Sequence, residues 1–184
     1  MRGFLLILAC MLLVAPLRAA APPVDPAPRP ALTSIMARAA TRAGQWQAAA
    51  RLWRGQTLAL PSDGEAWAGL GLALLEQGEA ADAAIALERA ALLMPGDFGL
   101  WLHRGRAALA LGLGPAAHTA FAAYTASRPG DARGWTGLGV ALDLSGNHGE
   151  AQIAYGRALA LDPLNAAARH NLALSQALAV RAAP

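Results

Sequence analysis

The sequence repeats itself every 34 residues, and this period constrains the fold more than any other feature. One series of prolines and one of glycines keep the interval: Pro61, Pro95, Pro129 and Pro163, and Gly44, Gly78, Gly112 and Gly146. Three tryptophans form a third series, and a glycine follows each of them four residues later. A fixed period of this length is typical of a stack of similar units, each packed on the next.

Each period has the pattern of two helices joined by a turn. In the first helix, the tryptophan, the glycine four residues later and a following apolar residue such as Leu74 or Leu142 share one face. The glycine there lets a neighbouring helix approach closely. The glycine of the second series predicts a left-handed residue that ends this helix. A second helix follows, with Ala83, Leu87 and Ala90 in one unit, and the proline ends it.

The residues that recur are those of a known repeat family. In one complete unit they are Trp135, Leu138, Gly139, Leu142, Gly146, Ala151, Tyr155, Ala158 and Pro163. This set resembles the tetratricopeptide-repeat consensus. The resemblance implies an all-α fold, a right-handed superhelix (α-solenoid) of about four helix-turn-helix repeats plus a C-terminal capping helix.

The period also divides the chain. We expect a signal peptide at 1–21, a proline-rich linker at 22–31, a degenerate first repeat at 32–63, three complete repeats at 64–97, 98–131 and 132–165, and a capping helix and tail at 166–184. The first repeat has Thr33 and Ala37 where the tryptophan and glycine would stand. The linker holds five prolines in ten positions, which favours either an extended spacer or a disordered start of the mature chain.

The first residues have the three parts of a secretory signal. Arg2 precedes an apolar run from Phe4 to Val14, which is too short to span a bilayer as an ordinary helix, and small residues follow at Ala19–Ala21. We expect cleavage after Ala19, which predicts an exported, periplasmic protein.

Cys10 leaves an alternative open. Ile7-Leu8-Ala9-Cys10 loosely resembles a bacterial lipobox, in which the cysteine is lipidated and starts the mature chain. Membrane association, as an outer-membrane-associated lipoprotein, is expected only in that case. Otherwise Cys10 is an apolar residue of the signal core, and the mature chain has no cysteine for a disulfide or a thiolate metal site.

Charge argues against nucleic acid as a partner. Every basic residue is an arginine, and without Arg2 and Arg18 there are thirteen against twelve acids. Nucleic acid requires a clustered basic surface to neutralise phosphates. Residues 26–62 carry only basic charges, whereas 63–97 carry seven acids and Arg89. The basic segment is either a solvated face or a surface that docks on an acidic partner or anionic lipid.

Catalytic patterns are missing from the sequence. The four histidines, His103, His118, His148 and His170, are isolated, and none has a paired ligand spacing or a nucleophile beside it. We therefore expect no enzyme activity, no catalytic or metal site, no cofactor and no small-molecule substrate.

The family resemblance implies a concave groove that is lined by the first helix of each repeat and binds a protein or peptide partner. The groove positions carried over to this chain are Glu65, Ala68, Leu72, Leu75, Glu76, Leu102, Arg106, Leu109, Arg133, Thr136, Val140, Asp143 and Leu144. Most are apolar, which suits an extended or helical peptide with apolar anchors. Each leucine has the alternative of packing inside the superhelix. Ala68, Leu72 and Leu102 replace the polar residues with which some relatives grip a peptide carboxylate.

A finer resemblance concerns residues 134–179. Gly139-Val140-Ala141-Leu142-Asp143, Glu150-Ala151-Gln152 and Asn171-Leu172-Ala173-Leu174-Ser175 are similar to the last repeats of TadD-like proteins of tight-adherence (Flp) pilus assembly. This resemblance implies an envelope scaffold in pilus biogenesis. The alternatives are an envelope adaptor in another pathway, such as cytochrome maturation or polysaccharide export, or a regulatory subunit of an enzyme.

Overall fold

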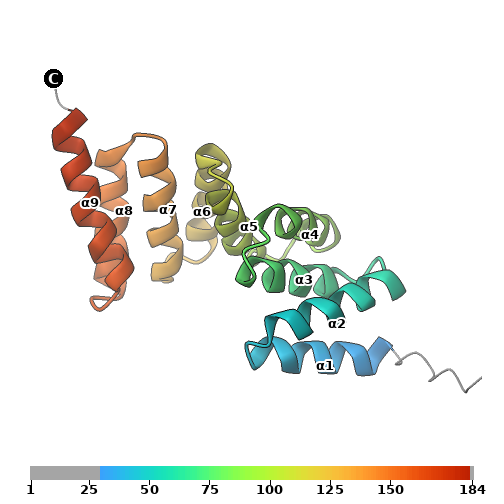
Figure 1. Cartoon of the computed structure of the whole chain (residues 1–184). Coiled ribbons are helices and arrows are strands. Elements are labelled where there is room, and N and C mark those ends of the chain that lie inside the picture. The colour runs from blue at the N-terminus through green and yellow to red at the C-terminus, as the bar shows by residue number, and fades with distance from the viewer. Residues whose placement is uncertain (1–29, 183–184) are drawn as a thin grey trace, which may run out of the picture.

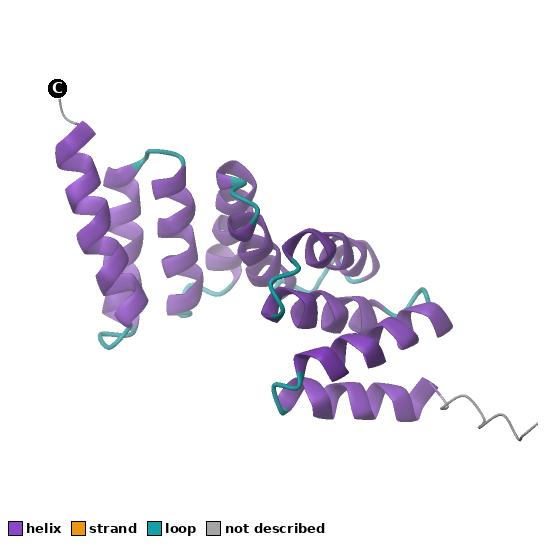
Figure 2. Ribbon diagram, in the orientation of Figure 1, coloured by secondary structure: helices purple, strands orange, loops and turns teal. Residues whose placement is uncertain are grey.

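The computed structural model describes residues 30–182, which form nine helices and no strand (Figures 1 and 2). They are α1 (Pro30–Arg42), α2 (Trp46–Ala59), α3 (Gly64–Glu76), α4 (Ala80–Leu93), α5 (Leu100–Ala110), α6 (Gly114–Ser127), α7 (Ala132–Leu144), α8 (His148–Leu161) and α9 (Ala166–Ala182). The predicted all-α solenoid is confirmed. The signal peptide, Cys10 and most of the linker lie outside the described residues. None of the nine helices is long and apolar enough to span a membrane.

The first helix begins inside the segment assigned to the linker. Helix α1 starts at Pro30, two residues before the expected boundary of the first repeat. Proline is tolerated in the first turn of a helix, where its missing N–H would have no partner within the helix. The proline-rich composition alone therefore does not locate the end of the linker.

Glycines end the first helix of each repeat as the period predicts. Gly44, Gly78, Gly112 and Gly146 all have a left-handed backbone, with φ between 66° and 82°. A side chain is rarely accommodated in this conformation, so the turn to the second helix is set by the local sequence.

A second series of glycines brings the two helices of a repeat together. A Cβ atom added at Gly71, Gly105 or Gly139 would overlap Leu87, the Phe121 ring or the Tyr155 ring, respectively, although each pair belongs to two different helices. The large side chains are fully buried there. Small residues also line the second helices. One alanine recurs there every 34 residues and has no exposed surface: Ala49, Ala83, Ala117 and Ala151.

The helices form two layers. Each odd-numbered helix contacts the next odd-numbered helix, whereas no even-numbered helix of the described chain contacts another even-numbered one. Because the odd-numbered helices lie closer together, the stack curves around them, and they line its concave side. Figure 1 shows that the helices turn along the stack, so that α7–α9 run across the direction of α1–α3.

The junction between the second and third repeats differs from the other two internal junctions. Helix α5 has 11 residues, whereas α3 and α7 have 13 each, because its first turn is not formed. Leu100 occupies the position at which the neighbouring repeats have the smaller Ala66 and Gly134. Phe98 is 51% exposed, and two crevices, of about 320 and 220 Å³, border this junction.

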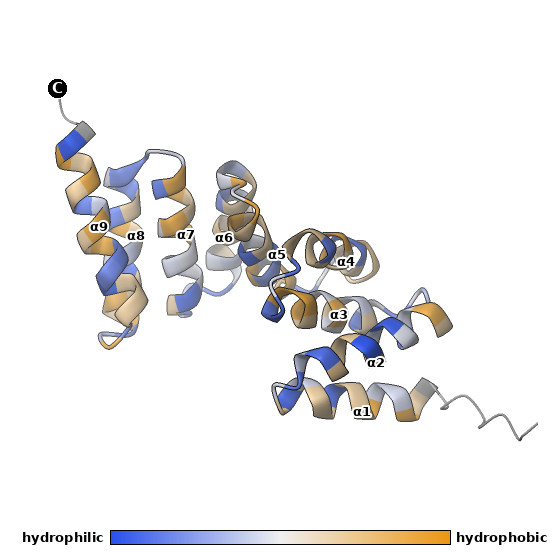
Figure 3. Ribbon diagram, viewed as in Figure 1, coloured by the Kyte–Doolittle hydropathy of each residue, from blue (hydrophilic) through white to orange (hydrophobic). Residues whose placement is uncertain are grey.

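The helices at both ends of the stack, α1 and α9, contain hydrophobic residues (Figure 3). Leu32, Ile35 and Met36 of α1 are about half exposed, as are Leu174 and, to a greater extent, Val180 of α9. Terminal units of a stacked array have no neighbour on one side, and a polar outer face is the usual arrangement there, so these apolar side chains depart from it.

Candidate functional site: the concave groove

The concave side holds a pocket of about 470 Å³ where α5, α7 and α9 face one another. We call it the groove pocket. Six of its lining residues were expected from the sequence: Leu102, Arg106, Leu109, Arg133, Thr136 and Val140. Six more complete it: His103, Phe121, Gly137, Asn165, Ala167 and Asn171. The structure therefore brings together six of the eight expected groove positions of the third and fourth repeats and adds the capping helix.

The floor of the groove pocket is apolar. It is formed by Leu102 and Leu109 of α5, Val140 of α7 and the ring of Phe121, which reaches the pocket from α6. A Cβ atom at Gly137 would overlap that ring, so the absence of a side chain at this position allows the ring to reach the floor. Removing such a surface from water is favourable. An apolar side chain bound there would contribute about 25 cal/mol of free energy for each Å² of apolar surface that is buried.

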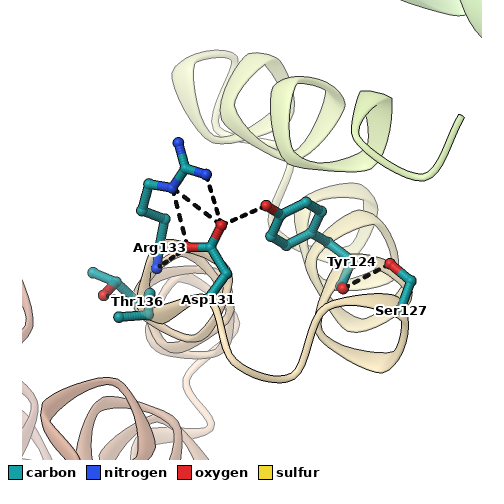
Figure 4. Close-up of polar contacts among 6 residues, drawn as sticks. Tyr124, Ser127, Asp131, Arg133 and Thr136 are labelled. Carbon is teal, nitrogen blue, oxygen red and sulfur yellow. Dashed lines mark hydrogen bonds and ion pairs between the residues drawn. The ribbon is translucent and has the colours of Figure 1, made fainter. Parts of the chain in front are cut away.

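Arg133 stands on the rim in a fixed orientation. Its Nε and Nη2 donate to the Asp131 carboxylate, at 3.0 and 2.6 Å, and the Tyr124 hydroxyl donates to the same carboxylate at 2.6 Å. Figure 4 shows both side chains directed at Asp131. Asp131 also accepts from the Arg133 backbone N–H and so caps α7. The hydrogen bonds from Arg133 hold the pKa of Asp131 far below its usual range, while hydrogen bonding to Asp131 raises the pKa of Arg133.

Arg106 is the second cation of the rim. Its Nη2 lies 2.7 Å from a carboxylate oxygen of Glu76, which connects α5 to α3. His103 lines the pocket beside it, and its buried Nδ1 has no hydrogen-bond partner among the described residues. Burial, and then the charges of Arg106 and Arg133, lower the pKa of His103. His103 is therefore neutral at pH 7, and the positive charge of the pocket comes from the two arginines.

The capping helix supplies the wall opposite α5. Asn165 caps α9 by accepting from the Ala168 N–H at 3.0 Å, and its amide nitrogen donates to Thr136 at 3.2 Å. Asn171, one turn and a half further along, is half-buried and lines the pocket. Its side-chain amide has no hydrogen-bond partner in the part of the chain that the structure describes.

Four predicted groove residues of the second repeat lie outside the groove pocket. Glu65 forms an ion pair with Arg38 of α1 and is exposed. Ala68 and Leu75 pack against buried side chains of the interior, the alternative left open for the leucines. Leu72 is half-buried on α3. Glu76, the fifth of this repeat, touches the pocket only through its ion pair with Arg106.

Asp143 points into the protein and not into the groove pocket. One carboxylate oxygen accepts from the Ser175 hydroxyl at 2.7 Å and lies 2.8 Å from His148 Nδ1, and the other accepts from the Tyr155 hydroxyl at 2.9 Å. Ser175 is completely buried. Its hydroxyl also lies 3.3 Å from the backbone oxygen of His148, and no hydrogen bond among the described residues joins it to the imidazole ring, so Ser175 and His148 do not form a nucleophile–base pair. Leu144, beside Asp143, is half exposed and does not line the pocket.

The 34-residue period indicates several of the pocket residues that were not among the expected groove positions. His103, Gly137 and Asn171 are separated by 34 residues each and are therefore equivalent positions of successive units. None of the expected groove residues comes from this position of the repeat. Ala167 follows Arg133 by the same interval. Asp143 stands where Leu75 and Leu109 stand in the preceding repeats, and such a polar exception in an apolar series indicates a specific partner.

The arrangement is suited to binding. Among residues 30–182 no group of three or more metal-ligating side chains is brought together. What the groove pocket offers is an apolar floor, two oriented guanidinium groups and a free amide, which are the elements with which proteins hold a peptide segment.

Comparisons with known proteins agree on the repeat. The model of the tetratricopeptide repeat family matches residues 36–97 and 102–152. No curated protein matches the chain. A solved structure of MamA from Desulfovibrio magneticus RS-1, residue 41 to the end, has a TM-score of 0.71 and 20% identity, with 84% of this chain and 93% of that chain covered.

Two further solved structures have the same fold. An RS-1 MamA double mutant gives a TM-score of 0.74 at 22% identity, covering 82% of this chain and 85% of that chain. YrrB, described as a TPR protein with an unusual peptide-binding site, gives 0.71 at 16% identity, covering 84% and 79%. At these identities the likeness concerns the fold.

Proposed function

Because this chain belongs to the tetratricopeptide repeat family, we propose that it is a scaffold that binds a protein partner through the groove pocket. The observation that carries this proposal is the groove pocket itself, where three successive inner helices, α5, α7 and α9, present an apolar floor and a polar rim to solvent. The peptide-binding site of YrrB supports a peptide or protein as the occupant.

Cross-linking in cells tests where the partner binds. A photoreactive amino acid would replace Leu109 or Val140 in the groove pocket, Leu72 in the neighbouring part of the groove, or Ile85 and Ile153 on α4 and α8. The last two side chains are 68% and 67% exposed and serve as matched controls on the outer layer. We expect capture of a distinct protein from Leu109 and Val140. Equal capture from Ile85 and Ile153, or capture of this protein alone, contradicts the proposal.

We also propose that the protein is exported and acts in the periplasm. The support is the order of a basic start, a short apolar run and small residues within 1–21. Mass spectrometry of the mature protein is expected to find Ala20 as its first residue. A mature protein that starts at a lipidated Cys10 would replace the periplasmic assignment by an outer-membrane lipoprotein, and an intact Met1 would contradict export.

Within the envelope, we propose a role in tight-adherence pilus assembly, supported by the similarity of residues 134–179 to TadD-like proteins. Deletion of the gene is expected to abolish surface pili, and a plasmid copy is expected to restore them. A plasmid copy in which serine replaces both Leu109 and Val140 tests whether the groove itself is required. The amount of the variant in the cell is measured as well, so that a loss of stability is recognised. Normal pili in the deletion strain contradict this role.

A further inference from the structure

The groove pocket combines an apolar floor with a cationic rim, and we propose that it selects a peptide segment in which an acidic residue adjoins a large apolar one. The apolar side chain fills the pocket and the carboxylate lies against Arg106 and Arg133. This inference rests on the proposed function, since it specifies the chemistry of the partner that the same groove binds.

The charges of the lining residues are the first argument. Two arginines line the groove pocket, and no aspartate or glutamate does. The carboxylates that pair with these arginines, Glu76 and Asp131, stand behind the rim on α3 and at the start of α7. A segment that brings its own carboxylate meets opposite charge at this site, and a basic segment meets like charge.

Both arginines keep hydrogen-bond donors for a ligand. Arg106 uses only Nη2 in its ion pair, and Arg133 uses Nε and Nη2. A guanidinium has five N–H groups, so the remaining donors of each side chain have no partner among the described residues. The two side chains are 41% and 72% exposed, which leaves these donors accessible.

Arg133 is held in place before any ligand arrives. Its two bonds to Asp131, and the bond from Tyr124 to the same carboxylate, fix the plane of the guanidinium. A fixed arginine loses little side-chain freedom when it binds a carboxylate, so more of the interaction remains as affinity. Both arginines also lie close enough to His103 to lower its pKa, after burial and against the opposing charges of Glu76 and Asp97.

Asn171 provides the contact to the backbone of the segment. Its amide group both donates and accepts hydrogen bonds, as a peptide bond does, and it is the free amide of the capping wall, since that of Asn165 is used by Thr136 and by the start of α9. The opposite end of the groove carries the acidic Glu65. The acidic residue of a bound segment is therefore directed toward Arg106 of α5 and Arg133 of α7.

A peptide library tests the inference directly. The full mature protein, immobilised, is incubated with acetylated and amidated nonapeptides that are randomised at their four central positions. We expect enrichment of aspartate or glutamate next to leucine, isoleucine, methionine or phenylalanine. The best peptide is then measured by fluorescence anisotropy against versions in which the acid becomes its amide, or the apolar residue becomes serine.

Three variants assign the selectivity to the rim. R106Q/R133Q is expected to bind the best peptide about tenfold more weakly, since each exposed charge pair contributes up to about 1 kcal/mol, and to lose the preference for acid over amide. R51Q/R89Q changes the net charge equally at exposed positions outside the pocket and is expected to bind normally. N171D adds a negative charge at the wall without a change of shape, and we expect it to reject the acidic peptide.

The outcomes separate the inference from the proposed function. Enriched peptides without an acidic residue, or an acid preference that R106Q/R133Q retains, overturn the inference. The same holds if the protein retains no peptide while Leu109 and Val140 still cross-link to a partner in cells. Absence of both retained peptides and cross-links overturns the proposed function as well.

Discussion

At the scale of single residues, Gly139 and Gly156 lie on the same pair of helices, α7 and α8, but differ in the space around them. Gly139 of α7 faces the ring of Tyr155 so closely that a Cβ atom would overlap it, whereas a Cβ atom at Gly156 of α8 would meet nothing within 4 Å. Both lie within regular helix. The first glycine serves packing, and the second only lowers helix propensity.

We therefore expect opposite effects from two identical substitutions. G139A should lower the free energy of unfolding by about 1–3 kcal/mol, because the Tyr155 ring must move in a filled interior. G156A should raise it by about 0.5–1 kcal/mol, because alanine restricts the unfolded chain. Urea unfolding followed by circular dichroism measures both. A G139A protein as stable as the parent would contradict the close packing of α7 on α8.

Because His103 is partly buried, we expect the free energy of unfolding to depend on pH. Burial and two arginines depress its pKa in the folded chain below the ordinary value of 6.5. The unfolded chain therefore takes up this proton more readily, so stability is full above pH 6.5 and declines as the pH falls through that value. Unfolding at pH 7.5 and 5.5 measures the decline. H103Q should reduce it, whereas H118Q, at an exposed position, should not; equal declines in both would contradict the assignment.

At the scale of helices, the sequence predicts those features of the fold that depend on residues close together in the chain. The glycines with left-handed backbone, such as Gly44 and Gly146, end helices because of their own conformational freedom, and their period locates the turn inside each repeat. The groove pocket was predicted only in part, because its position depends on how successive repeats rotate. The inward direction of Asp143 depends on Ser175, a residue 32 positions away on the capping helix.

The capping helix gives a prediction of its own. Ser175 is the buried donor that joins α9 to Asp143 of α7. S175A leaves that half-buried carboxylate with one hydrogen bond fewer, at a cost of about 1–3 kcal/mol. We expect faster amide hydrogen exchange along α9 and unchanged exchange in α1–α4. S145A, which removes an exposed hydroxyl from the end of α7, is the control, and equal exchange in both variants would contradict the role of Ser175.

At the scale of the whole molecule, the junction between α4 and α5 divides the stack. Asp97 accepts from the Gly99 N–H at 2.8 Å, and α5 begins at Leu100 with Gly99 as its N-cap and no side-chain cap. Two ion pairs cross from the second repeat to α5, Arg104 with Glu88 and Arg106 with Glu76, and all are partly exposed. Exposed pairs contribute about 0–1 kcal/mol each and are screened by salt.

We expect this junction to open before the rest of the molecule. Hydrogen exchange should be fastest in the first turn of α5, and 0.5 M NaCl should accelerate it there more than in α3 or α7. G99A should slow that exchange by favouring an earlier start of the helix, whereas G96A, in the open loop before it, should not. Uniform exchange across the described helices, insensitive to salt, would contradict a weak junction.

The contact between Asp143 and Ser175 also bears on how such an array can change its length in evolution. In the preceding repeats the position of Asp143 holds Leu75 and Leu109, and the position of Ser175 holds Ala73, Ala107 and Ala141. A tandem duplication of residues 132–165 would place a copy of Ala141 opposite the first Asp143 and remove one of the two hydroxyl donors of that half-buried carboxylate. A copied repeat inserted between α8 and α9 is therefore expected to lose this hydrogen bond, whereas a copy inserted among the earlier repeats would not disturb it.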